Sequence, residues 1–358
     1  MNLPFLRTQS EPVPGYLLAF EKGSPQAAAP FARLLDATLT QGRLAPVTKI
    51  GMGIDVAKRL GNVYAERHLA RRLRAYPASQ RDERERLALE YAQRLTDDVQ
   101  GIDADFFRKI DLVFNDSEIV ELTQTVCTMN YFVRLCAALG LVPEPWLSSA
   151  PAPAPRSEPP SESTRITLSS DEEMTWAGEL ASPTGGDPWG LGVRVLNSQR
   201  AMLRSPEAGR AWMAYWQSVR KTESVPRATL LQVSFAVSKA NGCRYCQVHQ
   251  VVGLRRQKIE IGKLLSLEKS DEALAPEEKV AVSFARKLTK SPSLVDRSDR
   301  EALAKAFPDG KDLEIVLQTC AFSYMNRFTD NLGLPSEEEA VKIYKEVFGA
   351  LPKKGARK

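Results

Sequence analysis

The two halves of this chain repeat each other, and this repeat limits its fold more than any other feature. Two constant offsets in residue number relate the halves, the first equal to 181 and the second equal to 193. The first offset pairs Ser24, Pro25, Gly61, Tyr64 and His68 with Ser205, Pro206, Gly242, Tyr245 and His249. The second offset pairs Glu121, Cys127, Tyr131, Arg134, Leu139, Gly140 and Leu141 with Glu314, Cys320, Tyr324, Arg327, Leu332, Gly333 and Leu334. A period of about 190 residues indicates two copies of a domain, not a solenoid. The second offset exceeds the first by about 12 residues, which predicts one insertion in the second copy near 261–275.

The apolar residues of each copy recur at helical spacing. In Ala228–Ala240, Glu278–Leu288 and Asp312–Phe328 they lie three and four positions apart, as on one face of a helix. Alternating patterns of the kind found in strands are absent from the sequence. We therefore predict an all-α protein with two tandem helical domains. Their matched apolar faces need cover, so we expect them to pack as a pseudo-dimer.

A segment rich in proline and serine separates the two copies. Its prolines favour an extended polyproline conformation, and its serine and glutamate residues do not build a core. We predict a first domain at 1–147, a linker at 148–187, a second domain at 188–350 and a basic tail at 351–358. The alternative for the linker is a tract bound by a proline-reading domain.

Composition narrows the cellular setting and the partners. The 358 residues carry a net charge of +5 and only five cysteines. That charge is too dilute to indicate nucleic acid as a partner, and so few cysteines do not form a disulfide scaffold. The N-terminal residues show no apolar segment typical of a signal peptide, and no apolar run is long enough to span a membrane. We therefore expect a cytoplasmic, reducing location, with neither nucleic acid nor membrane as a partner.

Residues 241–249, with the sequence NGCRYCQVH, form the one local motif that suggests chemistry. A helix is predicted to end before Gly242 and the next to begin near Cys243. Both thiols would then lie in a first helical turn, where free N–H groups and the helix dipole lower a thiol pKa. The spacing of three lets Cys243 and Cys246 form a disulfide, and it also lets His249 reach Cys246. These are the groups needed for thiol–disulfide exchange or peroxide reduction.

Two other interpretations of the motif remain open. One is a structural zinc site made by Cys243, Cys246 and His249, but a closed site needs a fourth ligand. The second histidine of the chain is His68, and there is no second CxxC sequence. The other interpretation is a pair of buried, inert cysteines. The remaining thiols lie in apolar helical stretches and are predicted to be core residues; they are Cys127, Cys136 and Cys320.

The second copy resembles the AhpD-like, carboxymuconolactone decarboxylase-like superfamily of small all-α proteins. The residues that carry the resemblance are Ala228–Ala240, the NGCRYCQVH motif and NRFTDNLGLP at Asn326–Pro335. It covers about 190–335 well and about 15–143 as a degenerate copy. A layout with a redox cysteine motif in one of two copies is also similar to sestrins. The resemblance implies an antioxidant alkylhydroperoxidase with a redox-active disulfide, in which Cys246 attacks the peroxide and Cys243 is the resolving partner.

The sequence departs from this family at the proton relay. Peroxidase members carry a glutamate twelve positions before the first cysteine, where this chain has Leu231 with Gln232 beside it. The family histidine lies four positions after the second cysteine, where this chain has Gln250, and His249 comes one position earlier. We therefore expect slow peroxide reduction.

Comparison of the two copies separates structural from functional candidates. The counterparts of the cysteines in the first copy are Asn62 and Ala65, although that copy keeps the tyrosine and the histidine of the motif. Retention of His68 without thiols favours a structural role for His249 as much as a catalytic one. Asn326 and Asp330 differ between the copies, as the cysteines do. We therefore predict that they line the active-site pocket together with Tyr245. The alternative is that Asn326 and Asp330 are helix-surface residues. Arg134 and Arg327 occur in both copies and are predicted to be structural, at the contact between the copies.

The sequence thus predicts a thiol-dependent peroxidase or disulfide oxidoreductase, with Cys243, Cys246 and His249 as catalytic residues. No metal and no cofactor are expected. The expected partners are a peroxide substrate and a dithiol or protein reductant, and a homo-oligomer is compatible with the sequence. The alternative is a non-catalytic regulatory or scaffold protein with an AhpD-like fold.

Overall fold

The computed structural model describes residues 13–76, 82–147, 165–170, 191, 193, 195–221, 224–269 and 271–352, and these residues form helices and loops without a strand. The helices of the first half are α1 (Gly15–Gly23), α2 (Pro25–Thr40), α3 (Pro46–Arg59), α4 (Val63–Leu73), α5 (Glu83–Asp97), α6 (Ala104–Asp111) and α7 (Asp116–Ala138). Those of the second half are α9 (Asn197–Met202), α10 (Pro206–Arg220), α11 (Arg227–Ala240), α12 (Arg244–Arg256), α13 (Ile261–Lys269), α14 (Pro276–Lys290), the 3-10 turn η1 (Pro292–Leu294), α15 (Arg297–Ala306), α16 (Lys311–Asn331) and α17 (Glu338–Phe348). The predicted all-α class is confirmed. Helix α13 occupies the predicted insertion.

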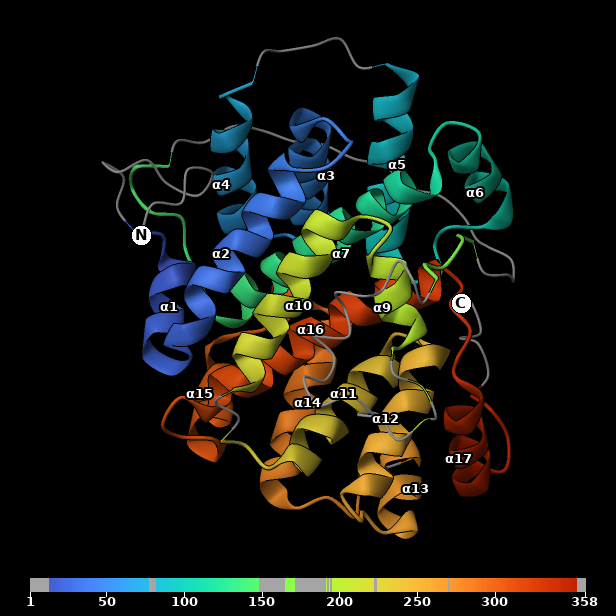
Figure 1. Cartoon of the computed structure of the whole chain (residues 1–358). Helices are drawn as coiled ribbons and strands as arrows, with labels where there is room; N and C mark the ends of the chain where they lie inside the picture. The colour runs from blue at the N-terminus through green and yellow to red at the C-terminus, as the bar shows by residue number, and fades with distance from the viewer. Residues whose placement is uncertain are drawn as a thin grey trace.

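The two long helices α7 and α16 pack against each other at the centre of the molecule (Figure 1). Helices α3, α4 and α5 lie on one side of this pair, and α11, α12 and α14 on the other. Helix α10 of the second half packs along α2 of the first. Most of the buried apolar side chains of α7 and α16 belong to one core that extends through both halves. The contact between the halves is therefore itself a core.

Two buried arginines join the halves in a reciprocal way. Arg327 on α16 donates from Nε to the Leu95 carbonyl at 3.2 Å and from Nη2 to the Thr96 carbonyl at 3.3 Å, both in the last turn of α5. Arg134 on α7 donates from Nη2 to the Thr289 carbonyl at 3.2 Å, in the last turn of α14. Carbonyls in a last helical turn have no partner within their own helix. Each arginine thus caps a helix of the other half, at the copy contact predicted for these two residues.

Replacing either arginine should destabilise the protein. Arg327→Met leaves the Leu95 and Thr96 carbonyls without their side-chain donor, and Arg134→Met leaves the Thr289 carbonyl and Asn130 Oδ1 without theirs. We expect Arg327→Met to lower the free energy of unfolding by about 2–3 kcal/mol, because a buried polar group that loses its partner costs about 1–3 kcal/mol. Urea unfolding at equilibrium measures both variants. Wild-type stability in Arg327→Met would show that these hydrogen bonds do not hold the halves together.

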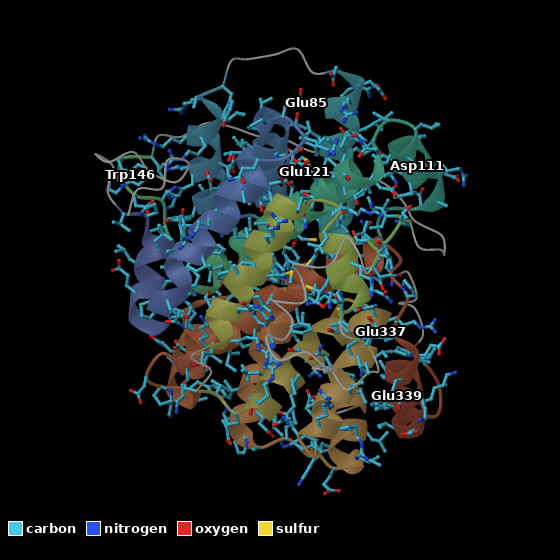
Figure 2. All side chains as sticks on the ribbon, viewed as in Figure 1. Glu85, Asp111, Glu121, Trp146, Glu337 and Glu339 are labelled. Atoms are coloured by element: carbon cyan, nitrogen blue, oxygen red, sulfur yellow. The ribbon has the colours of Figure 1, made fainter. Side chains whose placement is uncertain are left out.

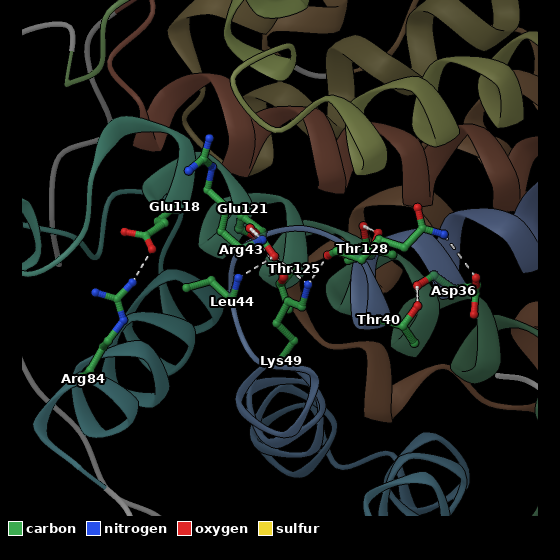
Figure 3. A network of polar contacts seen from close by, with 12 residues as sticks. Asp36, Thr40, Arg43, Leu44, Lys49, Arg84, Glu118, Glu121, Thr125 and Thr128 are labelled. Atoms are coloured by element: carbon green, nitrogen blue, oxygen red, sulfur yellow. Dashed lines mark hydrogen bonds and ion pairs between the residues drawn. The ribbon is translucent and has the colours of Figure 1, made fainter. Parts of the chain in front are cut away.

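A glutamate also plays the same part in each half. Glu121 on α7 accepts hydrogen bonds from the backbone N–H groups of Arg43 (2.8 Å) and Leu44 (3.2 Å), just before α3 (Figure 3). In the second half Glu314 accepts from the N–H groups of Ser224 and Val225, each at 2.9 Å, just before α11. These matched contacts agree with the duplication that we infer from the two sequence offsets.

Most of the predicted linker lies outside the described residues, but 165–170 belong to them and contact both halves. The Arg165 N–H donates to the Leu332 carbonyl at 3.0 Å, and the Thr167 N–H donates to Asp116 Oδ2 at 3.0 Å. Ile166 is buried in the shared core. This part of the linker therefore adds to the core, contrary to what its composition suggested.

No helix among the described residues has both the length and the apolar character needed to cross a membrane.

Candidate functional site

The cysteine motif lies at a tight turn between α11 and α12. Helix α11 ends at Ala240, and Gly242 has a φ of 71°, a left-handed conformation that glycine adopts without strain. Cys243 is the N-cap residue of α12, and its Sγ accepts a hydrogen bond from the Cys246 N–H at 3.4 Å. The predicted helix start is confirmed, with both thiols in its first turn.

Both thiols are free and share one polar neighbour, Thr329 on α16. The Thr329 Oγ1 atom lies 3.3 Å from Cys243 Sγ and 3.4 Å from Cys246 Sγ. Cys243 is fully buried, while Cys246 is 3 % exposed. Thr329 was not among the site residues predicted from the sequence. A signal was present, since the position aligned with it in the first half is Cys136, so this residue changes between the halves as the cysteines do.

The electrostatic surroundings of Cys243 differ from the expected ones. Burial raises the pKa of the Cys243 thiol well above its usual range, and the neighbouring Cys246 and the charge of Asp330 raise it further. We predicted a lowered pKa from the position at the helix start alone. Complete burial outweighs the helix dipole here, because a thiolate loses its hydration in the core.

Two of the three residues predicted to line the pocket hold the turn that carries the cysteines. Asn326 Oδ1 accepts from Asn241 Nδ2 at 2.9 Å, and Asn326 Nδ2 donates to Ser238 Oγ at 3.1 Å. Asp330 Oδ1 accepts from the Arg244 N–H at 3.3 Å, at the first residue of α12. Asn326 is fully buried, so it is not a helix-surface residue. A pocket lined by Asn326, Asp330 and Tyr245 stays a prediction.

The first half also contributes to this turn. Gln100, in the loop after α5, donates from Nε2 to the Gly242 carbonyl at 3.4 Å. The aligned turn of the first half has a similar neighbour, since a Cβ atom built on Gly61 would lie 3.3 Å from the Cβ of Ser293 in η1. Helix α14, which precedes η1, is aligned with α5. The segment that follows each of these two helices therefore lies against the glycine turn of the other half.

His249 is bound away from the thiols. Its Nε2 lies 2.5 Å from Glu337 Oε2, and its Nδ1 lies 2.7 Å from the Tyr245 carbonyl. The Tyr245 ring stacks on the imidazole with 4.1 Å between centroids, and its hydroxyl donates to Glu337 Oε1 at 3.2 Å. Figure 2 shows Glu337 beside α12, just before α17. Both ring nitrogens therefore have partners other than Cys246, unlike the contact that the spacing of three predicted.

The first half builds the same triad of tyrosine, histidine and glutamate without cysteines at the motif positions. His68 Nε2 lies 2.9 Å from Glu144 Oε2, and the Tyr64 hydroxyl donates to Glu144 Oε1 at 2.8 Å. Glu144 also accepts from the N–H of Gly15, the first residue of α1, at 2.9 Å. In the same way Glu337 accepts from the N–H of Asn197, the first residue of α9, at 2.8 Å. Neither glutamate was predicted as a site residue, although the second of the two offsets aligns them.

The two triad glutamates are held as carboxylates. Burial alone would raise their pKa values. Hydrogen bonds and the histidine charge outweigh burial and lower the pKa of Glu337, and backbone, tyrosine and histidine contacts do the same for Glu144. Burial lowers the pKa of His68, against the opposing effect of Glu144. The triad of the first half therefore holds the start of α1 against α4. The triad of the second half holds the start of α9 against α12.

The matched triads permit a controlled test of His249. We expect His249→Asn and His68→Asn each to lower the free energy of unfolding by about 1–3 kcal/mol, because they leave the buried Glu337 and the half-buried Glu144 carboxylate with fewer partners. The rate at which Cys243 and Cys246 are oxidised should stay within about twofold in both, because no histidine nitrogen bonds a sulfur. A loss of oxidation rate confined to the folded His249→Asn variant would instead make His249 catalytic.

Positions 231 and 250, where the family resemblance implies the glutamate and histidine of a proton relay, hold side chains that cannot transfer a proton. Leu231 belongs to a second apolar cluster and packs against α12, where a Cβ on Gly253 would lie 2.9 Å from Leu231 Cδ2. Its neighbour Gln232 donates to Glu278 Oε1 at 3.0 Å. Gln250 lies one turn before Gly253, and its Oε1 is buried without a hydrogen-bond partner among the described residues. The relay expected for the family is therefore replaced by an apolar side chain and an unpaired amide oxygen.

A metal is not favoured by this arrangement. In the described part of the chain, no group of three or more His, Cys, Asp and Glu side chains could hold a metal ion. The zinc set of Cys243, Cys246 and His249 is not assembled, since the imidazole nitrogens bind Glu337 and a backbone carbonyl.

Comparison with known proteins finds one family model that matches part of the second half. Residues 206–286 match the model of the carboxymuconolactone decarboxylase family, a range that includes α11, α12 and both cysteines of the motif. The apo structure of the debrominase Bmp8 is 19 % identical, with a TM-score of 0.45, covering 52 % of this chain and 98 % of that one. A Bmp8 variant in complex with 2,3,4-tribromopyrrole is 17 % identical, with a TM-score of 0.45, covering 51 % and 96 %. These similarities are too low to transfer the chemistry of Bmp8. No curated protein matches the sequence.

Proposed function

We propose that this chain, a member of the carboxymuconolactone decarboxylase family through its second half, is a thiol-dependent peroxidase or disulfide oxidoreductase. The observation that carries the proposal is the pair of free thiols in the first turn of α12, with both sulfurs in contact with the same Thr329 oxygen. Two sulfurs placed around one atom, three positions apart at a helix start, are arranged to form a disulfide with little backbone movement.

The chemistry divides between the two cysteines. Cys246 Sγ, the attacking sulfur that the family resemblance implies, attacks the peroxide: an S–O bond forms, the O–O bond breaks, and the departing alcohol takes a proton. Cys243 Sγ then attacks the sulfur of the resulting sulfenic acid, so that an S–S bond forms and water leaves. An external dithiol reduces the disulfide and becomes a disulfide itself. The cycle needs no metal and no cofactor.

We propose slow turnover and a supporting role for the first half. This chain lacks the glutamate at 231 and the histidine at 250 that the family resemblance implies, so this pair does not supply the proton for the departing oxygen. The first half has Asn62 and Ala65 at the cysteine positions and contributes Gln100 and the Arg327 contacts to the site region. A cytoplasmic, reducing location suits a site whose thiols are free.

One set of observations favours the non-catalytic alternative. The Cys243 pKa is raised by burial, and the relay positions are occupied by Leu231 and Gln250. A regulatory or scaffold protein that has lost turnover would show these features.

Peroxide consumption distinguishes the two functions. The full chain is mixed with dithiothreitol and either hydrogen peroxide or cumene hydroperoxide, and the loss of peroxide is followed at steady state. The enzyme proposal predicts repeated turnover above the rate of the reductant alone. Folded protein that consumes no more peroxide than the reductant would support the scaffold function.

A further inference from the structure

Thr329 differs from the other buried threonines of the central helices. Several of them donate their hydroxyl proton to the carbonyl one turn earlier, as Thr319 does to Ile315 (2.8 Å) and Thr329 does to Met325 (2.9 Å). Such a bond alone is a structural feature of helices. Thr329 is distinct because its oxygen also lies within 3.4 Å of two cysteine sulfurs.

The single hydroxyl proton of Thr329 determines which atom donates in its contacts with the two thiols. A threonine hydroxyl has one proton and can accept two hydrogen bonds. Because the Thr329 proton is donated to the Met325 carbonyl, its oxygen is the acceptor toward both thiols. The Thr329 oxygen therefore accepts hydrogen bonds from the S–H groups of both cysteines that would form the disulfide. The Thr329 hydroxyl can donate its own proton elsewhere if it rotates away from the Met325 carbonyl.

Among the described residues, the other ionisable groups of the motif region are bound to partners of their own. Cys243 is fully buried. His249 is bound to Glu337, and Asp330 binds the Arg244 N–H. Thr329 also changes together with the motif, since the first half has Cys136 at the aligned position and no thiols at Asn62 and Ala65.

We propose that the Thr329 hydroxyl carries the proton between the two sulfurs in the step that forms the disulfide. In that step the Cys243 S–H proton passes to Thr329 Oγ1, and the Thr329 O–H proton passes to the hydroxyl of the Cys246 sulfenic acid. Cys243 Sγ bonds to Cys246 Sγ, the Cys246 S–O bond breaks, and water leaves. Thr329 ends the step with one proton, as it began. This inference rests on the proposed thiol peroxidase function and adds a catalytic residue to it.

The test measures the resolving step by itself. Reduced full-length protein is mixed with one equivalent of hydrogen peroxide, and the Cys246 sulfenic acid is trapped with dimedone at successive times and quantified by mass spectrometry. Thr329→Val, which keeps the shape and removes the hydroxyl, should prolong the sulfenic acid about 10²-fold, within the range for a lost acid–base group. Thr329→Ser should restore a lifetime within about threefold of wild type, because the hydroxyl returns. The control Thr319→Val removes a similar helix hydrogen bond away from the thiols and should leave the lifetime unchanged.

The outcomes separate this inference from the function on which it rests. A wild-type lifetime in Thr329→Val, or a long lifetime that Thr329→Ser does not shorten, would overturn the relay while leaving the peroxidase in place. Wild-type protein that forms neither sulfenic acid nor disulfide would overturn both. Should Thr329→Val not fold, the wild-type resolving step in D₂O gives the answer: relay through the hydroxyl predicts a slower step, and an unchanged rate contradicts it.

Discussion

Replacing Cys246 with serine should abolish catalytic peroxide consumption. The sulfur that attacks the peroxide is lost, and a serine hydroxyl is a much weaker nucleophile at neutral pH. We expect the rate to fall by at least about 10³-fold, to that of the reductant alone, as for other enzymes that lose their nucleophile. The measurement is steady-state peroxide loss with dithiothreitol in excess.

Two further variants control this result. Cys320→Ala changes a buried thiol on α16 that is remote from the motif in sequence and should keep most of the activity. Cys243→Ser should allow one attack on peroxide but no resolution, so the Cys246 sulfenic acid should accumulate. Equal activity in Cys246→Ser and wild type would place the chemistry at another thiol.

Restoring both relay positions should raise turnover by about 10²-fold, the lower end of the contribution of a positioned acid–base group. The double variant Leu231→Glu, Gln250→His places a carboxylate and an imidazole at neighbouring positions, because Leu231 packs at Gly253, one turn from Gln250. The histidine would supply the proton that the departing oxygen needs, and the glutamate would hold the histidine. Steady-state assays with hydrogen peroxide measure the gain.

The single variants show whether the pair acts together. Leu231→Glu alone places a carboxyl group in the apolar cluster next to the Gln250 amide. It should mainly lower the free energy of unfolding, since a buried charge without a partner is unfavourable. Gln250→His alone supplies a base without the carboxylate that orients it. A folded double variant no faster than wild type would show that the absent relay does not limit the rate.

Local patterns predicted the helices well because their apolar side chains recur every three and four positions, although α11 and α16 are buried on nearly all sides. Spacing of three and four positions identified α11, α14 and α16, and the difference between the two offsets located α13. The repeat also gave reason to doubt a catalytic His249, and the matched triads with Glu144 and Glu337 support that doubt.

Tertiary contacts account for what the sequence did not reveal. Thr329 reaches the thiols from a helix 83 and 86 residues further along the chain, and Glu337 reaches His249 from 88 residues away. No local spacing encodes such pairs. The expected low pKa failed at Cys243 for a related reason: the position at a helix start is visible in the sequence, but the complete burial that raises the pKa comes from packing against α16.

Cys243 and Cys246 should form a reversible disulfide in the folded protein, and titration of the free thiols measures this. Reduced protein is treated with a small excess of hydrogen peroxide, unfolded in urea, and titrated for free thiols, and the peptides are then identified by mass spectrometry. We predict that two of the five thiols disappear, that they are joined in one peptide containing Cys243 and Cys246, and that dithiothreitol restores both. Finding Cys243 and Cys246 both free after peroxide treatment, in protein that remains folded, would show that this disulfide does not form.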